Sequence, residues 1–446
     1  MSMFRFFLII STFFFVSLAL RFWNLGQFNT LVFDEVYYAK FANNYLTQTP
    51  FFNSHPPLTE YLIAIGIWMG SWFPASPDIT NNLTGSWHST VSYRWLNALT
   101  GSFFPIILGA IAYQLTHRYS YTIIVTFLAT LEGLFLVESR YALNNIYLVN
   151  FGLLSHLLFL LFINQKKYLC LTLSGIFLGA ASAIKWNGLG FLLGIYLIIF
   201  IVYLSQKLKH LFDSRNLGIV ENINCLKPSL LLFNLLVIPM FTYSILWLPY
   251  LLLNPEYSWW EIHQKIWSFH QSIGDSSDVH PYCSKWYSWL IMARPIAYFY
   301  EKINTPSGTI IYDVHAMGNP ILWWLATGSI LIFSIFMIVT LFKQKYNPYL
   351  SVILFIIINY FANLLPWTLV SRCTFLYHYM PSYSFSLLGI GLIIEQCLIS
   401  GLIINRRLGI ILLLLISFAF IYWLPIYLGL PLSLRGFDLR MLPNWI

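Results

Sequence analysis

Long apolar runs recur along almost the whole of this chain, and they restrict its fold more than any other feature. Each run is about 20 residues long, the length that a helix needs to cross the hydrocarbon core of a bilayer. The runs are continuously apolar and do not alternate with polar residues, so they predict helices and not the strands of a barrel. A water-soluble globule is excluded because 58% of the residues are hydrophobic and only 9% are charged.

The apolar pattern predicts an all-α polytopic membrane protein with about eleven spans. The spans are expected near residues 4–24, 94–115, 121–137, 146–163, 168–184, 188–205, 230–252, 320–342, 347–365, 375–398 and 408–427. The first span is long and has no clear small-residue cleavage site, so we expect a retained signal anchor. We expect one transmembrane domain over residues 1–446, with large loops at residues 25–93 and 253–319.

Charges in the connections predict the orientation. With the N-terminus in the cytoplasm, 12 of the 24 basic residues fall on the inner side, whereas most acids fall on the outer side. Short basic clusters favour the cytoplasmic side of a membrane. Both large loops are therefore expected on the outer face. The net charge of +8 is a topology signal and gives no reason to invoke nucleic acid.

The five cysteines show no paired or metal-like spacing. Only Cys283 and Cys373 are expected on the outer side, so one disulfide is open there but is not indicated by the spacing.

Two adjacent acids, Asp34 and Glu35, directly follow the first predicted span. Acids at a membrane exit are costly unless they take part in chemistry or binding. The same loop continues into the segment His55-Pro56-Pro57-Leu58. The alternative is an exposed acidic loop without a role. We interpret this region as an active site where a lipid-borne substrate meets a polar acceptor.

Several segments together resemble the protein O-mannosyltransferase family, the polyprenyl- or dolichyl-phosphate-mannose-dependent enzymes of the GT-C class. The matching segments are Phe33-Asp34-Glu35, His55-Pro56-Pro57-Leu58, Ser139-Arg140-Tyr141, Ile184-Lys185-Trp186-Asn187-Gly188, 280–289, Arg294-Pro295-Ile296, Gly318-Asn319-Pro320 and 372–379. The resemblance is to shorter bacterial-type members, because the second loop has no room for the β-trefoil domain of eukaryotic members. Glu60 departs from the pattern, since members usually carry a basic residue there.

The resemblance implies transfer of mannose, with inversion, from a polyprenyl-phosphate donor to Ser or Thr hydroxyls of translocating proteins. The expected location is a bacterial plasma membrane with the site on its outer face, or an ER membrane with a lumenal site, with secretion machinery as a further partner. A GT-C enzyme that transfers another sugar to an outer-leaflet lipid stays open. A secondary transporter also stays open, although the chain shows no paired broken helices in matching halves.

Such a transfer needs a base for the hydroxyl proton and cations for the leaving phosphate. The resemblance makes Asp34 the base and lets Glu35 orient the acceptor or the sugar. Three cations at expected outer boundaries either bind the phosphate or snorkel to headgroups, namely Arg140, Lys185 and Arg372. The matching segments add further substrate-binding candidates, namely His55, His378, Tyr379, His280, Trp286 and Arg294.

Histidine spacing argues against one obvious metal site. His263 and His270 lie on an expected helix, separated by about 10 Å of rise. One metal ion needs ligands about 2 Å away, so both cannot bind it. With Trp267 they form one helical face, expected to pack on the loop or to line the acceptor groove. A divalent ion at Asp34 and Glu35 stays open, but the family resembles metal-independent enzymes, so we expect no metal and no required cofactor.

Overall fold

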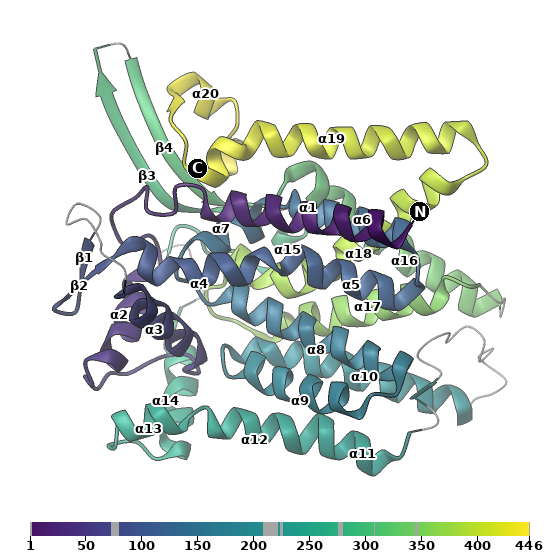
Figure 1. Cartoon of the computed structure of the whole chain (residues 1–446), viewed down its shortest axis with the longest axis horizontal. Coiled ribbons are helices and arrows are strands. Elements are labelled where there is room, and N and C mark those ends of the chain that lie inside the picture. Colours follow the sequence, from purple (N-terminus) through teal and green to yellow (C-terminus); the bar gives the residue numbers. More distant parts are fainter. Residues whose placement is uncertain are drawn as a thin grey trace.

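The computed structural model describes residues 2–72, 80–207, 222–223, 226–274, 280–306, 308–343 and 347–445. Figure 1 shows long helices that run side by side, with short helices and two β-hairpins gathered at one end. We call this end the loop face; it is formed by the described parts of residues 24–89 and 254–319 and by residues 365–376. Cys225, one of the three cysteines that the sequence left without an expected partner, lies outside the described residues.

The membrane helices confirm the all-α prediction. Among the described residues, nine helices are long and apolar enough to cross a membrane, or ten if one bent pair counts as a span. They are α1 (Met3–Phe22), α4 and α5 (Thr90–Ser102, Phe104–Thr116), α8 (Asn145–Gln165), α10 (Leu189–Lys207), α11 to α13 (Pro228–Leu253), α16 (Pro320–Lys343), α17 (Leu350–Leu364), α18 (Met380–Ile399) and α19 (Ile403–Leu428). The two remaining predicted spans correspond to the bent pair and to the shorter helix α9 (Tyr168–Ser182).

The bent pair consists of α6 (Tyr119–Thr130) and α7 (Gly133–Arg140), which meet at 57°. Glu132 stabilises the break, because its carboxylate accepts hydrogen bonds from the amides of Phe135, at 2.9 Å, and Asn319, at 3.3 Å. The first amides of a helix lack partners within it, so the side chain of Glu132 acts as a cap. The bend carries the end of α7 to the loop face, beside the segment that follows α1.

The first large loop folds into α2 (Glu35–Leu46), α3 (Leu58–Gly70) and a hairpin of β1 (Thr80–Leu83) and β2 (Ser86–Ser89). The sequence predicts a helix at residues 58–68, and α3 confirms it. This helix buries one face against α2 and α4 and does not simply lie on the membrane surface.

The second large loop contains α14 (Trp259–Ser272), α15 (Trp286–Trp289) and a long antiparallel hairpin of β3 (Ile296–Thr305) and β4 (Gly308–Ala316). The hairpin projects from the loop face beside α20 (Leu434–Asp438), as Figure 1 shows. A short strand near the C-terminus, β5 (Leu432–Ser433), pairs with β4. The two large loops therefore form structured caps over one end of the helix bundle.

Candidate active site

Asp34 stands at the start of α2, at the loop face. The turn before it is tight, because the amide of Glu35 donates to the carbonyl of Val32 and Phe33 has a φ of 53°. A bulky residue rarely adopts this left-handed conformation, so surrounding contacts must hold it. The ring of Phe33 stacks on that of Tyr298, with centroids 4.2 Å apart. The carboxylate of Asp34 forms no cap hydrogen bond to α2 and is left for another partner.

Glu35 is fully buried and has both carboxylate oxygens committed to the protein. Arg94 donates to one oxygen at 2.8 Å and to the other at 2.7 Å. The amides of Val32 and Ala142 each donate one further hydrogen bond of 2.8 Å. Four donors fill the acceptor capacity of a carboxylate. These contacts hold Glu35 in the turn that presents Asp34, and the expected role of Glu35 in orienting the acceptor or the sugar stays a prediction.

The carboxyl of Asp34 has an unusual proton affinity. Burial raises its pKa to about 6, and the ammonium of Lys185 partly opposes this effect. Burial, followed by the charge of Asp34, also raises the pKa of Tyr38 well above its usual value. A carboxyl with a pKa close to the working pH is suited to accept a proton from a hydroxyl group and release it again.

Lys185 lies between α9 and α10, and its side chain is buried. Its Nζ donates to Oδ1 of Asn145 at 3.3 Å. Burial and the nearby charge of Arg372 lower its pKa to about 8, against the opposing effect of Asp34 and Glu138. Lys185 is therefore within electrostatic reach of the acid predicted to act as base and of a second predicted phosphate-binding cation.

A cavity of about 520 Å³ opens on the other side of Lys185. Its polar residues include His55, Lys185, Asn187, His270, Asn363 and Arg372. Apolar residues of α10 and of the segment after α17 form the rest of the wall, including Leu189, Leu193, Leu369 and Val370. The described lining does not include Asp34, so Lys185 connects the acid to the cavity. An apolar trough with cations at one end suits a lipid that carries an anionic headgroup.

Two histidines stand beside the cations of the cavity. The rings of His55 and His270 lie 5.3 Å apart, centroid to centroid. Burial, and then neighbouring cations, lower the pKa of His55 well below its usual value and that of His270 to about 4. Both imidazoles are therefore neutral near pH 7. Trp267 also lines the cavity, whereas His263 does not and pairs with the hydroxyl of Tyr243 at 2.7 Å.

Arg140 has a structural role that the sequence did not reveal. Its Nη1 donates to the carbonyls of Leu20, Arg21 and Trp23, at 2.9, 3.1 and 2.7 Å. These carbonyls lie at the C-terminal end of α1, where the last carbonyls of a helix have no N–H donor within it and need one from outside. The side chain is buried at the end of α1 and does not line the cavity, and the expected binding of phosphate by Arg140 stays a prediction.

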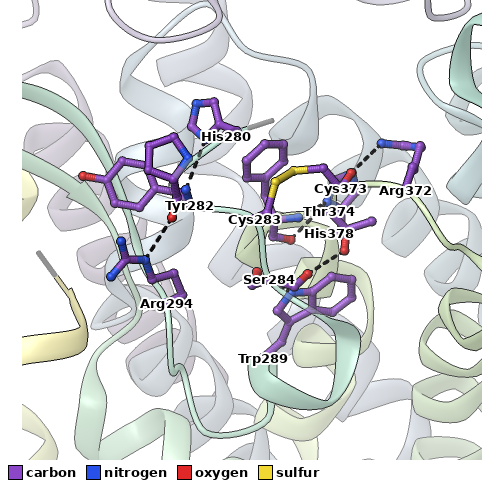
Figure 2. The surroundings of a disulfide bond; sticks show 12 residues. His280, Tyr282, Cys283, Ser284, Trp289, Arg294, Arg372, Cys373, Thr374 and His378 are labelled. Carbon is purple, nitrogen blue, oxygen red and sulfur yellow. Dashed lines mark hydrogen bonds between the residues drawn. A yellow bond between two sulfur atoms is a disulfide. The ribbon is translucent and has the colours of Figure 1, made fainter. Parts of the chain in front are cut away.

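Arg372 is held in place by a disulfide, Cys283–Cys373, which joins the second large loop to the segment before α18 (Figure 2). Nη1 of Arg372 donates to the carbonyl of Cys373 at 3.0 Å. Beside it, Thr374 donates through Oγ1 to the carbonyl of Ser284 at 2.6 Å and accepts from the amide of Ser284 at 2.8 Å. The bond that the sequence left open is formed, and it fixes the backbone on which Arg372 stands.

His378 and Tyr379 follow Arg372 but are both buried away from the cavity. Nδ1 of His378 lies 3.0 Å from the amide of Phe375, and its ring packs 4.5 Å from that of Trp367. The hydroxyl of Tyr379 pairs with that of Tyr360 at 2.8 Å. Both side chains thus contact other protein groups, and their expected contacts with substrate stay a prediction.

The remaining candidates, His280, Arg294 and Trp286, do not line the cavity, and Figure 2 shows His280 and Arg294 near the disulfide. His280 accepts a hydrogen bond from the amide of Tyr282 at 3.2 Å. Arg294 donates to the carbonyls of Pro281, at 3.3 Å, and Asn444, at 2.9 Å. Trp286 packs against the hydrophobic core. These contacts organise the loop, and the expected contacts of the three side chains with substrate stay a prediction.

Sequence reasoning missed the acid Glu138. It lies on α7, is fully buried, and accepts hydrogen bonds from the hydroxyl of Tyr298 and from Nδ2 of Asn145, the latter at 3.2 Å. Asn145 in turn accepts from Lys185. A signal was available, because Glu138 is an acid within an otherwise apolar helical run. Glu138 thus fixes the amide that positions Lys185 beside Asp34.

Metal ligation at the acid pair is restricted by the same geometry. Among the described residues, no group of three or more His, Cys, Asp or Glu side chains could hold a metal ion. Glu35 could join Asp34 as a ligand only by giving up the hydrogen bonds of Arg94. The expectation that no metal is needed stays a prediction.

Comparison with known proteins places this geometry in context. Residues 11–248 match the family described as dolichyl-phosphate-mannose-protein mannosyltransferase, and residues 255–445 match the C-terminal four-helix region of protein O-mannosyltransferase. The structure superposes on a chain of the protein O-mannosyltransferase Pmt1–Pmt2 complex of S. cerevisiae, solved with the sugar donor bound, with a TM-score of 0.83 and 16% identity. That match covers all of this chain and 93% of the yeast chain.

Two bacterial relatives carry the name polyprenol-phosphate-mannose–protein mannosyltransferase. The protein of Corynebacterium glutamicum is 26% identical over 70% of this chain and 64% of its own length. The protein of Mycolicibacterium smegmatis is 23% identical over 95% of this chain and 90% of its own length. The match to the first relative spans slightly less than two thirds of it, whereas the match to the second spans almost all of it.

Proposed function

Because this chain belongs to the dolichyl-phosphate-mannose–protein mannosyltransferase family, we propose that it transfers mannose from a polyprenyl-phosphate donor to Ser and Thr hydroxyls of proteins. The observation that carries the proposal is the line of charges from Asp34 through Lys185 to Arg372. The two cations border a cavity with an apolar wall, while the acid lies beyond Lys185. The ammonium group of Lys185 therefore lies between the position of the lipid phosphate and the base, Asp34.

The donor lies with its lipid chain along the apolar wall formed by α10 and the segment after α17. Its phosphate is held by Arg372 and Lys185, whose positive charge stabilises the negative charge that develops as the sugar leaves. Both flanking imidazoles, of His55 and His270, are neutral, so they add no charge beside the phosphate. The cations are in place before the reaction, because the disulfide and the Glu138 network hold the segments that carry them.

The acceptor hydroxyl approaches from the side of Asp34. Its proton passes to the carboxylate as the hydroxyl oxygen bonds to the anomeric carbon and the bond from that carbon to the phosphate oxygen breaks. Attack from the face opposite the phosphate gives inversion at the sugar. Protonated Asp34 then releases its proton to water, which the pKa of about 6 permits near neutral pH.

The same proposal includes the finer points of orientation and partners. Asp34 and the cavity lie at the loop face, and we propose that this face is the outer side of the membrane. The short basic clusters lie at the opposite end, which is then the cytoplasmic side. The acceptors are then proteins that have crossed the membrane, which is the reason to expect a link to secretion machinery.

The test is transfer of mannose from polyprenyl-phosphate-mannose to a Ser/Thr-rich peptide by the purified protein in detergent. Asp34→Asn is expected to lower kcat by about 10²–10⁴-fold and to leave donor binding unchanged, because only the base is removed. Asp438→Asn, at an exposed acid on α20, is the matched control and should behave like wild type. If the protein transfers mannose to a lipid acceptor and not to the peptide, the acceptor in this proposal is a lipid and not a protein. If substrate crosses the membrane of vesicles and no mannose is transferred, the proposed transferase function is refuted.

A further inference from the structure

Asn187 is a residue of the cavity that the proposed reaction does not yet use. It lies in η2 (Trp186–Gly188), the single helical turn between α9 and α10. Both polar atoms of its amide, Nδ2 and Oδ1, are shielded from bulk solvent and form no hydrogen bond with any described residue. A buried amide without partners is costly, at about 1–3 kcal/mol for each unsatisfied group. Such a group in a cavity wall indicates a ligand that supplies the missing partners.

The backbone around Asn187 holds the amide where it is. The amide of Gly188 donates to the carbonyl of Lys185 at 2.8 Å, which closes the turn. Nε1 of Trp186 donates to the hydroxyl of Tyr243 at 3.0 Å and anchors the preceding side chain. A Cβ at position 188 would stand 2.6 Å from the backbone of Ala181, so the turn is packed closely against α9. The amide is therefore presented by a rigid turn, in the same short segment as Lys185.

Two more unpartnered polar atoms border the same cavity. They are Nδ1 of His270 and Oδ1 of Asn363, the latter on a side chain that is only 4% exposed. The set thus contains hydrogen-bond acceptors as well as donors. A cavity built for a phosphate alone would need donors and cations, because a phosphodiester offers only acceptor oxygens. A polyprenyl chain offers neither donors nor acceptors.

We propose that Asn187 binds hydroxyl groups of the transferred sugar and is a specificity-determining residue for it. This inference rests on the proposed function and names the part of the donor that the amide recognises. A sugar hydroxyl both donates and accepts, so neighbouring hydroxyls satisfy Oδ1 and Nδ2 of one amide together. A site that hydrogen-bonds a substrate hydroxyl rejects analogues that lack it or place it elsewhere, because the buried polar atoms then remain unpaired.

Binding of two ligands separates a sugar contact from a phosphate contact. Polyprenyl-phosphate-mannose and polyprenyl phosphate share the lipid and the phosphate and differ in the sugar. For Asn187→Ala and Asn187→Ser we expect the Kd of the mannosyl lipid to rise roughly tenfold to a hundredfold, since two hydrogen bonds are lost. The Kd of polyprenyl phosphate should change by less than about twofold, because its contacts with Arg372 and Lys185 remain.

The matched control is Asn304→Ala, at an exposed asparagine near the tip of the β3–β4 hairpin, which should bind both ligands as wild type does. Wild type should also prefer the mannosyl lipid to the glucosyl lipid, and the Asn187 variants should lose most of that preference. Equal losses for both ligands would place the amide on the phosphate and overturn the inference, as would unchanged binding or a wild type that binds both ligands equally. Transfer to peptide, measured in parallel, decides the proposed function separately, because binding does not require an active base.

Discussion

Replacing Glu35 by glutamine tests whether the second acid of the pair supports the fold or acts on substrate. The change keeps the shape of the side chain and one acceptor oxygen. It removes the negative charge beside the buried guanidinium of Arg94, to which the salt bridge is 2.7 Å long. The new amide also turns N–H groups toward the amide of Val32 or toward Arg94, where a carboxylate oxygen accepts now.

The cost follows from leaving a cation buried without its partner. Breaking a buried pair on one side destabilises a protein by about 3–5 kcal/mol, which shifts a folding equilibrium roughly a hundredfold to a few thousandfold. Arg94 has three further hydrogen bonds, to the carbonyls of Leu25, Phe28 and Thr30, and these lie in the loop that leads to Asp34. The loss is therefore expected to loosen this loop first and to reduce activity through the placement of Asp34.

The assay compares thermal unfolding in detergent, followed by tryptophan fluorescence, with mannose transfer. Glu35→Gln should unfold at a clearly lower temperature than wild type, whereas Asp34→Asn should unfold close to wild type and lose only transfer. The double variant Glu35→Gln, Arg94→Met removes the unpaired cation and should recover part of the lost stability. The reasoning is refuted if Glu35→Gln unfolds like wild type and loses as much kcat as Asp34→Asn does. Glu35 would then have to contact the substrate.

Four further outcomes follow from the site. Transfer should fall as the pH drops through about 6, because Asp34, with its raised pKa, becomes protonated and can no longer act as a base. Transfer should also fall above about pH 8, because Lys185, with its lowered pKa, loses its charge. A profile that is flat from pH 5 to 9 would exclude both roles. Cys283→Ser with Cys373→Ser opens a loop of 90 residues, and the chain-entropy account puts the lost stability at about 4.6 kcal/mol. The double variant should raise KM for the donor because Arg372 loses its support, and an unchanged KM would show that the disulfide does not support the site. Arg372→Ala should raise KM for the donor with little change in unfolding, while Arg140→Ala should lower the unfolding temperature, and the reverse pattern would exchange their assigned roles. Transfer should persist after treatment with EDTA, and recovery of a lost activity by added Mg²⁺ or Mn²⁺ would establish a metal requirement.

Most of the fold could be predicted because the length of an apolar run is a property of the sequence itself. A helix must satisfy its own backbone within the bilayer, so each apolar run of sufficient length gives a helix whatever its neighbours are. The bend at Glu132 and the β3–β4 hairpin were not predicted. The first depends on a contact with Asn319, far away in the sequence. The second depends on pairing between two strands, and residues 300–304 of β3 are exposed, so this part of the strand carries no buried face that a pattern could show.

Only part of the site could be predicted, because residues of the same type at the same depth in the membrane can bind different groups. Arg140 and Arg372 were both expected at the boundary, where a guanidinium binds phosphate or backbone carbonyls equally well. Only the packing of α7 against α1 decides that Arg140 takes the carbonyls. Lys185 and Arg372 line one cavity, and their expected binding of phosphate stays a prediction. The support from Glu138 and the unpartnered amide of Asn187 depend on contacts that no local pattern contains.

The adjacent acids divide their roles because successive side chains of a helix point about 100° apart. Glu35 turns toward Arg94, which neutralises it within the fold, so no second carboxylate charge faces the substrate together with Asp34. The basicity of Asp34 is then set mainly by its burial and by the charge of Lys185. A donor phosphate at Lys185 and Arg372 offsets the positive charge that stabilises the carboxylate of Asp34 as an anion. Donor binding therefore strengthens the base at the moment it is needed, and without donor the same lysine keeps the acid ionised and ready.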